Sequence, residues 1–329
     1  MTAPRILSCA VVTLVALTAC TSAPGDPVVG PPTAGGVVGA GEGSGGPASS
    51  PEPGDPGVSP GAVALTADEY RTELQEARDP IRDAVKRLAG TGGLKTLGKQ
   101  LDRTTTAVDG AVTRLGALSP PAEVKAQHDG YVAALRDLSA SFGGARQDAA
   151  SQQLCTGPAV LANMGKEGSL SAVERAAGAL SGYPASVISV KAPKERDRRL
   201  SNGSFVASES RSGRGSLELR NGTAQDAVVI LVRGGRKAVS VYVRKKSKFK
   251  IQGVRDGNYK IYYTFGEDWD SKARTFTRSC DFQQFGKSVR FTTTRTATHI
   301  RWSVWTITLH SVVGGNVKPK KINPNDFPG

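Results

Sequence analysis

The chain has 329 residues, and its 43 Lys and Arg against 29 Asp and Glu give a formal net charge of +14. This balance favours partners that carry negative charge. The chain contains only three histidines and has no Gly-x-Ser-x-Gly or His-Glu-x-x-His motif. It therefore lacks the signatures of a serine hydrolase and of a zinc protease.

Residues 1–19 have the organisation of a secretory signal peptide. Arg5 precedes an apolar run over residues 6–17, which is too short to span a bilayer but suits an h-region. The sequence Leu-Thr-Ala-Cys that ends at Cys20 resembles the lipobox of bacterial lipoproteins. That resemblance implies cleavage before Cys20 and a lipid on its thiol, which would anchor the chain to the outer face of the cell membrane. The alternative is an ordinary signal cleavage site with Cys20 incidental.

Residues 20–62 are dominated by Gly, Pro and Ser and contain few large apolar side chains. Such a segment cannot offset its ordering entropy, so we expect a disordered tether. A flexible coil of this length reaches about 35 Å, which would hold the folded part clear of the lipid headgroups. The lipobox followed by this tether resembles an actinomycete-type lipoprotein.

Residues 63–185 have the pattern of an antiparallel helical bundle. Thr66 and Glu69 form a predicted capping box, and apolar positions then recur with a helical period in three stripes that begin at Tyr70, Leu94 and Val124. Short breaks rich in Gly or Pro separate the stripes. Pro80 lies inside the first stripe and should kink or split that helix. Residues 148–165 and 168–181 should add one or two further helices.

The period changes to two after a charged, proline-containing stretch, which we interpret as an interdomain linker over residues 186–213. Short strands with turn signals such as Asn221-Gly222 and Asp256-Gly257 then predict an all-β sandwich or barrel over residues 214–329. Residues 258–265 and 288–294 are among the predicted strands. The segments LRNGTAQDAVVILV, DGNYKIYYTFGEDWD and WTITLHSVVGGN are similar to a poorly characterised accessory domain of bacterial surface proteins. This resemblance covers about residues 214–327 and implies no catalytic residues.

Positive charge is concentrated in the predicted β domain. Residues 62–185 carry 14 Lys and Arg against 14 Asp and Glu, whereas residues 216–329 carry 21 against 8. Five of these positive residues lie within seven positions, at Arg244, Lys245, Lys246, Lys248 and Lys250. In a strand, Lys248, Lys250 and Gln252 would share one face. The run is either a solvated edge that prevents strand pairing or a patch that attracts an anionic polymer or surface.

Four cysteines occur, of which Cys9 and Cys20 belong to the predicted leader. Cys155 and Cys280 remain as a candidate disulfide in a compartment where disulfides persist, although the bond would have to join two predicted domains. Neither has a Cys or His at metal-ligand spacing, so we expect no zinc site. Cys280 could instead act as a nucleophile with His299 as its base, but no flanking motif supports that interpretation.

The remaining polar features favour structural roles. His128 falls on the apolar stripe of the third helix, which favours a core histidine over a ligand. The segment GEDWDSK places Glu267, Asp268 and Asp270 together, but a calcium site needs more ligands, and a polar turn with Trp269 packed beneath it is the favoured interpretation.

Trp302 and Trp305 are three apart in a strand predicted over residues 299–310 and should point to opposite faces. At least one of them should therefore be exposed, which is a hint of a recognition surface.

Two functional classes follow from these patterns. The favoured one is a non-enzymatic extracellular lipoprotein in which the β domain contacts an anionic wall polymer, a lipid headgroup or an envelope protein, while the bundle spaces or docks it. The location disfavours nucleic acid as a partner, and we expect no cofactor. The alternative is an envelope enzyme or a transport accessory with an unrecognised site.

Overall fold

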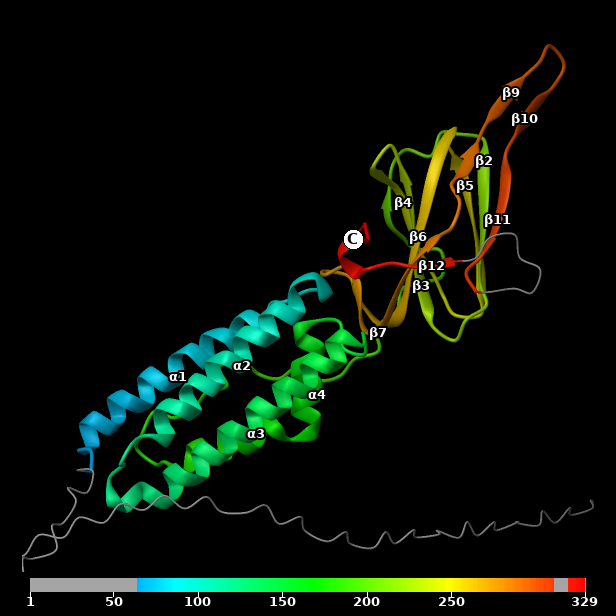
Figure 1. Cartoon of the computed structure of the whole chain (residues 1–329). Helices are drawn as coiled ribbons and strands as arrows, with labels where there is room; N and C mark the ends of the chain where they lie inside the picture. Colours follow the sequence, from blue (N-terminus) through cyan, green and yellow to red (C-terminus); the bar gives the residue numbers. More distant parts are fainter. Residues whose placement is uncertain (1–63, 311–318, 329) are drawn as a thin grey trace, which may run out of the picture. The chain divides into compact units, whose positions relative to one another are not determined.

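The computed structural model describes residues 64–310 and 319–328. The predicted signal peptide, Cys20 and the tether over residues 20–62 lie outside the described residues. The described chain begins with helices and continues with strands (Figure 1), which confirms the predicted order of a helical bundle followed by a β-sandwich.

Five α-helices form the N-terminal part of the described chain, and a single 3₁₀ turn precedes the third. They are α1 (Ala67–Ala89), α2 (Leu94–Gly116), η1 (Ala122–Val124), α3 (Lys125–Ala150), α4 (Gly157–Glu167) and α5 (Ser169–Ala179). Helix α2 packs between α1 and α3, while α5 packs on α3 and α4 contacts α1 and α5. The predicted capping box is confirmed, because the backbone N–H of Thr66 donates to Glu69 Oε2 at 2.9 Å and Thr66 Oγ1 accepts from the backbone N–H of Glu69 at 3.4 Å.

Helix α1 runs through Pro80 as one helix, so the predicted split is wrong. Proline removes a single backbone donor, which leaves the carbonyl of Glu76 without its helical partner. Pro80 and Glu76 are both exposed, so water can hydrogen-bond that carbonyl. The buried positions Ala77 and Ile81 meanwhile keep their places in the apolar stripe. Burial of this face therefore outweighs the local preference of proline.

The strands form three sheets. They are β1 (Phe205–Ser208), β2 (Gly215–Asn221), β3 (Asp226–Arg233), β4 (Arg236–Val243), β5 (Ser247–Val254), β6 (Gly257–Asp270), β7 (Thr275–Phe285), β8 (Val289–Phe291), β9 (Thr293–Arg295), β10 (Ile300–Trp302), β11 (Val304–Thr308) and β12 (Pro319–Lys321). The seven-stranded main sheet has the order β1-β4-β3-β6-β7-β12, with β8 also paired to β6. The small sheet has the order β11-β2-β5, in which β11 is parallel to β2.

The main and small sheets pack face to face around one core. That core joins Leu217 and Ile251 of the small sheet to Val229 and Tyr263 of the main sheet. The opposite face of the main sheet is covered as well, by a second cluster that contains Ile230, Trp269 and Phe327. This double coverage explains why β3 is apolar at nearly every position rather than alternating.

The predicted single strand over residues 299–310 is two strands that pair with different partners. Strand β10 pairs with β9 in a two-stranded ribbon, whereas β11 pairs with β2 of the small sheet. Ser303 separates them, and its hydroxyl accepts a hydrogen bond from the backbone N–H of Thr292 at 3.0 Å. The β9–β10 ribbon projects beyond the two packed sheets (Figure 1).

The predicted linker over residues 186–213 packs against both parts of the chain, because Val187 at its start belongs to the helical core and a strand forms near its end. Its residues 205–208 form β1, which pairs antiparallel with β4 at the end of the main sheet. Arg198 and Arg199, which precede this strand, bind carboxylates of β6 and β3. Two of the charged residues of this segment therefore serve ion pairs with buried carboxylates, while Lys191, Lys194 and Arg196 are exposed.

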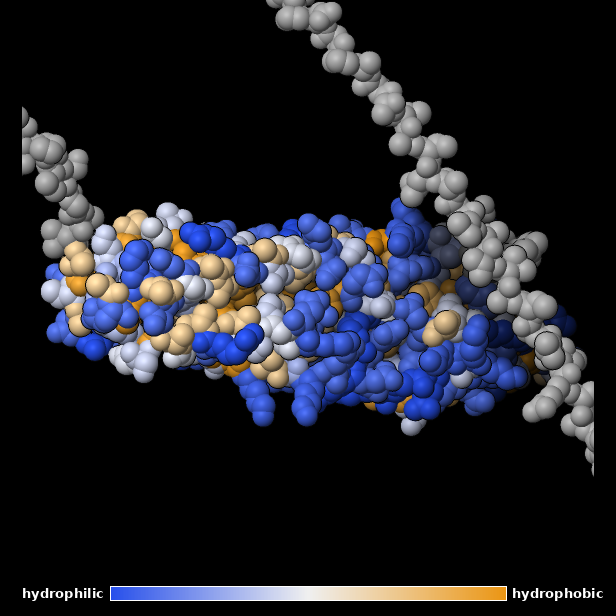
Figure 2. Space-filling model, turned by 90° about the horizontal axis from the view of Figure 1, so that it is seen from below, coloured by the Kyte–Doolittle hydropathy of each residue, from blue (hydrophilic) through white to orange (hydrophobic). Residues whose placement is uncertain are grey.

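A short 3₁₀ turn, η2 (Pro324–Asp326), and Phe327 end the described chain, and Lys95 Nζ donates to the carbonyl of Phe327 at 3.3 Å. The face drawn in Figure 2 is largely hydrophilic, and its hydrophobic side chains are interrupted by charged and polar ones.

Candidate functional site

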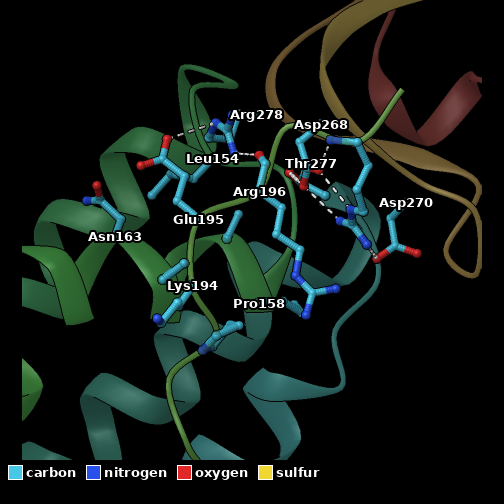
Figure 3. A pocket seen from close by; sticks show the side chains of 14 residues that line it. Leu154, Pro158, Asn163, Lys194, Glu195, Arg196, Asp268, Asp270, Thr277 and Arg278 are labelled. Carbon is cyan, nitrogen blue, oxygen red and sulfur yellow. Dashed lines mark hydrogen bonds and ion pairs between the residues drawn. The ribbon is translucent and has the colours of Figure 1, made fainter. Parts of the chain in front are cut away.

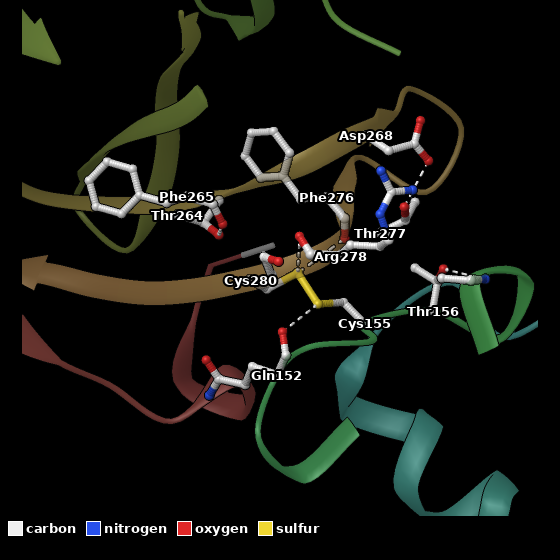
Figure 4. The surroundings of a disulfide bond; sticks show 12 residues. Gln152, Cys155, Thr156, Thr264, Phe265, Asp268, Phe276, Thr277, Arg278 and Cys280 are labelled. Atoms are coloured by element: carbon white, nitrogen blue, oxygen red, sulfur yellow. Dashed lines mark hydrogen bonds between the residues drawn. A yellow bond between two sulfur atoms is a disulfide. The ribbon is translucent and has the colours of Figure 1, made fainter. Parts of the chain in front are cut away.

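Cys155 and Cys280, the candidate disulfide pair, are bonded to each other in the structure (Figure 4). Two backbone hydrogen bonds of 2.9 Å flank the bond: the N–H of Cys155 donates to Thr277 O, and the N–H of Cys280 donates to Gln152 O. The loop before α4 is thereby fastened to β7. Because its sulfur is bonded to Cys155, Cys280 has no free thiol that could act as a nucleophile with His299 as its base.

A cavity of about 220 Å³ is lined by α4, residues 193–198 and strands β6 and β7 (Figure 3). Its main charges are paired with each other. The guanidinium of Arg198 contacts Asp268 at 2.7 Å and Asp270 at 3.0 Å, and Arg278 contacts Glu195 at 3.4 Å. The paired charges give this cavity a structural role.

The acidic segment around Asp268 is not a turn, because β6 continues to Asp270 and the turn follows it. Burial alone would raise the pKa of Asp268, but hydrogen bonds from the Arg198 side chain and backbone and from Thr277 outweigh it and hold that pKa below its ordinary value. These donors occupy the oxygens that a calcium ion would need. Trp269 is buried, as predicted, and packs against Phe276.

A second buried carboxylate, Asp226, fixes the turn that carries the basic run. Its two oxygens accept hydrogen bonds of 2.6 Å each from Arg199, and Oδ1 also accepts the backbone N–H of Lys245 at 2.8 Å. The hydroxyl of Tyr242 donates to the same carboxylate. Burial opposes ionisation of Asp226, yet these donors keep its pKa below the ordinary value. The position of the turn between β4 and β5 therefore depends on a charged group from another strand.

The five residues of the basic run have different surroundings. Arg244 donates from Nε to the carbonyl of Leu200 at 2.8 Å, and Lys246 donates from Nζ to that of Gly222 at 2.6 Å. Lys245 is exposed.

Lys248 and Lys250 lie on β5 and are exposed, while Phe249 and Ile251 between and beyond them turn inward, as predicted. Within residues 64–310 and 319–328, neither Lys248 nor Lys250 forms an ion pair.

The register of the small sheet places these lysines in a polar array that we call the outer face. Cross-strand neighbours form three rows: Val304, Ser216 and Gln252; Thr306, Glu218 and Lys250; and Thr308, Arg220 and Lys248.

Glu218 is paired with Arg220 at 2.6 Å, and its pKa is lowered first by the hydrogen bond from Arg220 and further by Lys248 and Lys250. The outer face thus combines hydroxyl and amide groups with excess positive charge, and Val304, 59% exposed, is its one apolar member.

A groove of about 320 Å³ opens at one end of the outer face, and we call it the Trp302 groove. It is lined by residues 213–216, Lys250, Gln252, Gly253 and Trp302. Trp302 is 47% exposed, and Trp305, three residues later, is 42% exposed. The expectation of at least one exposed tryptophan is confirmed. Trp305 differs from Trp302 because its indole N–H donates to the carbonyl of Arg290 at 2.9 Å and its ring does not line the groove.

His128 is a core residue, as its place on the helical stripe predicted. It is buried between α1 and the end of α2, with Nδ1 2.9 Å from the Tyr70 hydroxyl and Nε2 3.1 Å from the carbonyl oxygen of Leu115. Burial lowers its pKa, although the hydrogen bond to Leu115 acts in the opposite direction. His299, by contrast, is exposed and interacts through Nδ1 with Thr298.

Sequence reasoning missed the roles of Arg198, Arg199 and Asp226 and the association of Arg214 with the groove. The ion pairs join segments that are distant along the chain, so no local spacing of residues predicts them. A signal for the groove was present in the strand KFKIQGV, because an isolated glycine in a strand pattern marks a bulge or a close approach. Gly253 occupies that position.

In the part of the chain that the structure describes, no helix is both long and apolar enough to cross a membrane. Over the same residues, no three His, Cys, Asp or Glu side chains are grouped as metal ligands. Comparison with protein-family models, with curated proteins and with solved structures finds no match to this chain.

Proposed function

We propose that the protein is an extracellular lipoprotein, anchored through Cys20, whose β region binds an anionic polymer of the cell envelope without catalysing a reaction. The helical region acts as a spacer or docking element between the tether and the β region. The observation that carries this proposal is the pair of exposed lysines, Lys248 and Lys250, which lack ion-pair partners among the described residues.

Charge pairing elsewhere in the chain supports the proposal. The buried carboxylates Asp226 and Asp268 are already satisfied by arginines, so they do not attract a cationic ligand. The lysines of β5 are exposed, and they lie in a region, residues 216–329, that carries 21 basic residues against 8 acidic ones. Near an anionic surface each such lysine contributes about 1 kcal/mol. The β region therefore has an electrostatic reason to approach a polyanion.

The proposal is tested by sedimentation of the full-length protein, purified in mild detergent, with cell walls from a Gram-positive bacterium. Reversing two charges in the variant Lys248→Glu/Lys250→Glu should weaken retention at least about tenfold, because attraction becomes repulsion. A matched variant, Lys99→Glu/Arg103→Glu, changes the net charge equally on exposed positions of α2 and should bind like the natural chain.

Equal retention of the natural chain and both variants would contradict an electrostatic role for β5. Retention that is greater on vesicles with phosphatidylglycerol than on phosphatidylcholine alone, that is reduced in Lys248→Glu/Lys250→Glu, and that is absent on walls would assign the lysines to lipid headgroups, because the lipid on Cys20 inserts into either vesicle. Crosslinking of the natural chain to one envelope protein, with neither walls nor vesicles bound, would assign them to a protein partner.

A further inference from the structure

The Trp302 groove lies where a β-bulge interrupts the small sheet. Gly215 pairs with Val254, but the next residue, Ser216, pairs with Gln252, so Gly253 is an extra residue in β5. Its φ of +74° lies in the left-handed region, and a Cβ there would be 2.3 Å from the carbonyl oxygen of Arg211. Only glycine fits this bulge. Bulges of this kind re-aim neighbouring side chains and occur frequently beside functional sites.

Three kinds of chemical group meet at this groove. The indole ring of Trp302 provides a flat apolar surface, and no other aromatic ring or cation stacks on it among the described residues. Arg214 and Lys250 provide positive charge, and the exposed amide of Gln252 provides hydrogen-bonding groups. The rows of the outer face continue this pattern with Thr306 and Lys248.

We propose that the Trp302 groove and the outer face bind a glycan that carries carboxylate or phosphate groups. The C–H face of a pyranose ring would pack on the indole ring of Trp302, where both surfaces lose contact with water. Sugar hydroxyls would bond Gln252 and Thr306, and the acidic groups would contact Arg214, Lys248 and Lys250. This inference rests on the proposed function, since it names the chemical class of the anionic polymer.

Protection of a sheet edge does not account for all of these features. Strand β5 is an edge strand, and lysines on such a strand prevent pairing with other chains. Trp302 belongs to β10 and not to this edge, yet it lines the same groove as Lys250, and edge protection gives no reason for an exposed tryptophan there. A ligand that needs both charge and an aromatic surface accounts for their presence together.

The composition of the outer face favours a glycan over a bilayer. Insertion of this face into hydrocarbon would bury the exposed side chains of Thr306 and Gln252 without hydrogen-bonding partners, which is unfavourable for each group, and Val304 is its one apolar member. A hydrated polysaccharide instead supplies hydroxyl groups as partners for them. The lysines complement its acidic groups, so charge complementarity and polar matching point to the same ligand class.

The experiment measures binding of the full-length protein in detergent to soluble probes of known composition. Polygalacturonate and phosphorylated mannan are glycans with carboxylate and phosphate groups, dextran is a neutral glycan, and polyglutamate is a polyanion without sugar rings. We expect both acidic glycans to bind at least tenfold more tightly than either dextran or polyglutamate. Vesicles of phosphatidylglycerol and phosphatidylcholine provide the bilayer comparison.

Variants then separate ring packing from charge. Trp302→Ala should weaken binding of the acidic glycans about tenfold and leave weak polyglutamate binding unchanged. Trp302→Tyr should restore part of the loss, because it returns an aromatic ring. The matched control Trp305→Ala removes an equally exposed tryptophan outside the groove and should bind like the natural chain. Because the Trp302 side chain forms no hydrogen bond among the described residues, thermal unfolding followed by circular dichroism should be the same for both Trp302 variants and the natural chain.

The outcomes distinguish this inference from the proposed function. If the acidic glycans and polyglutamate bind equally and Trp302→Ala changes nothing, the glycan inference is overturned while the electrostatic function stands. Loss of vesicle binding in Trp302→Ala, with no glycan bound, would overturn it in favour of a bilayer. If no anionic probe or wall is bound, both proposals fail.

Discussion

His128 illustrates how a single buried side chain fixes its own protonation state. A carbonyl oxygen can only accept, so the contact with Leu115 O places the ring proton on Nε2. In the neutral ring Nδ1 must then accept the proton of the Tyr70 hydroxyl. A second ring proton would remove that acceptor and place a charge in the apolar core. The fold therefore selects the neutral histidine.

We predict that acidification destabilises the helical region through His128. Its folded-state pKa lies below the ordinary value of 6.5. As the pH falls through the ordinary value of 6.5, the unfolded state takes up a proton before the folded state does, so the free energy of unfolding decreases. Urea unfolding followed by circular dichroism at pH 7.5 and 5.5 measures this change. His128→Gln should show a smaller decrease between the two pH values, and an unchanged decrease would contradict the prediction.

At the residue scale, the sequence predicts positions whose role follows from local periodicity. His128 is one of them, because its stripe indicates burial whatever its partners are. Asp226 and Arg199 are not, since their pairing is decided by which strands the fold brings together. From the sequence alone, an aspartate before an apolar strand is equally consistent with an exposed turn residue and with a buried ion-pair partner. Its burial becomes visible only when β4 and residues 198–200 are placed around it.

At the element scale, the helices were predictable from the sequence, whereas the points at which several strands begin, end or divide were not. A helix that buries one face leaves an apolar stripe over 23 to 26 residues in α1, α2 and α3, which is a strong signal. The pattern predicts strands over residues 288–294 and 299–310. It does not show that the first divides into β8 and β9, or that the second divides into β10 and β11. Strand β6 runs beyond the predicted residues 258–265 because the register shift near Gly266 interrupts its alternation.

We predict that the disulfide between the α3–α4 loop and β7 stabilises the folded chain by about 2–5 kcal/mol, by restricting the unfolded state. The variant Cys155→Ala/Cys280→Ala should show this loss in the free energy of unfolding measured with urea. Dithiothreitol should lower the stability of the natural chain to a similar level and leave the variant unaffected. If the natural chain kept its full stability in reductant while its thiols became titratable, the prediction would be wrong.

At the scale of the whole molecule, the sequence predicts where charge accumulates but not how it is displayed. Counting residues locates the positive excess in positions 216–329. It does not show that Arg198 and Arg199 are used in ion pairs, or that Lys250 and Trp302 border one groove. The groove forms from the register of β11, β2 and β5 together with the separation of β10 from β11. Each of these depends on pairing between distant segments.

We predict that binding of the full-length protein to purified walls weakens with salt. Raising NaCl from 0.1 M to 1 M shortens the Debye length from about 10 Å to about 3 Å, which screens the exposed lysines. Sedimentation at both salt concentrations measures the effect. The variant Lys248→Glu/Lys250→Glu should show a smaller salt dependence than the natural chain. Retention of the natural chain that is equal at both concentrations would contradict the prediction.

The two adjacent arginines at the end of the irregular segment also affect how the chain withstands proteases. A trypsin-like enzyme must insert the arginine or lysine before the cleaved bond into its own acidic pocket. Arg198 and Arg199 are already held by Asp268 and Asp226, so cleavage after either one first requires its ion pair to open. Lys191, Lys194 and Arg196 are exposed nearby. The first cuts in this segment should therefore fall before Arg198, which leaves the β region with both arginines attached.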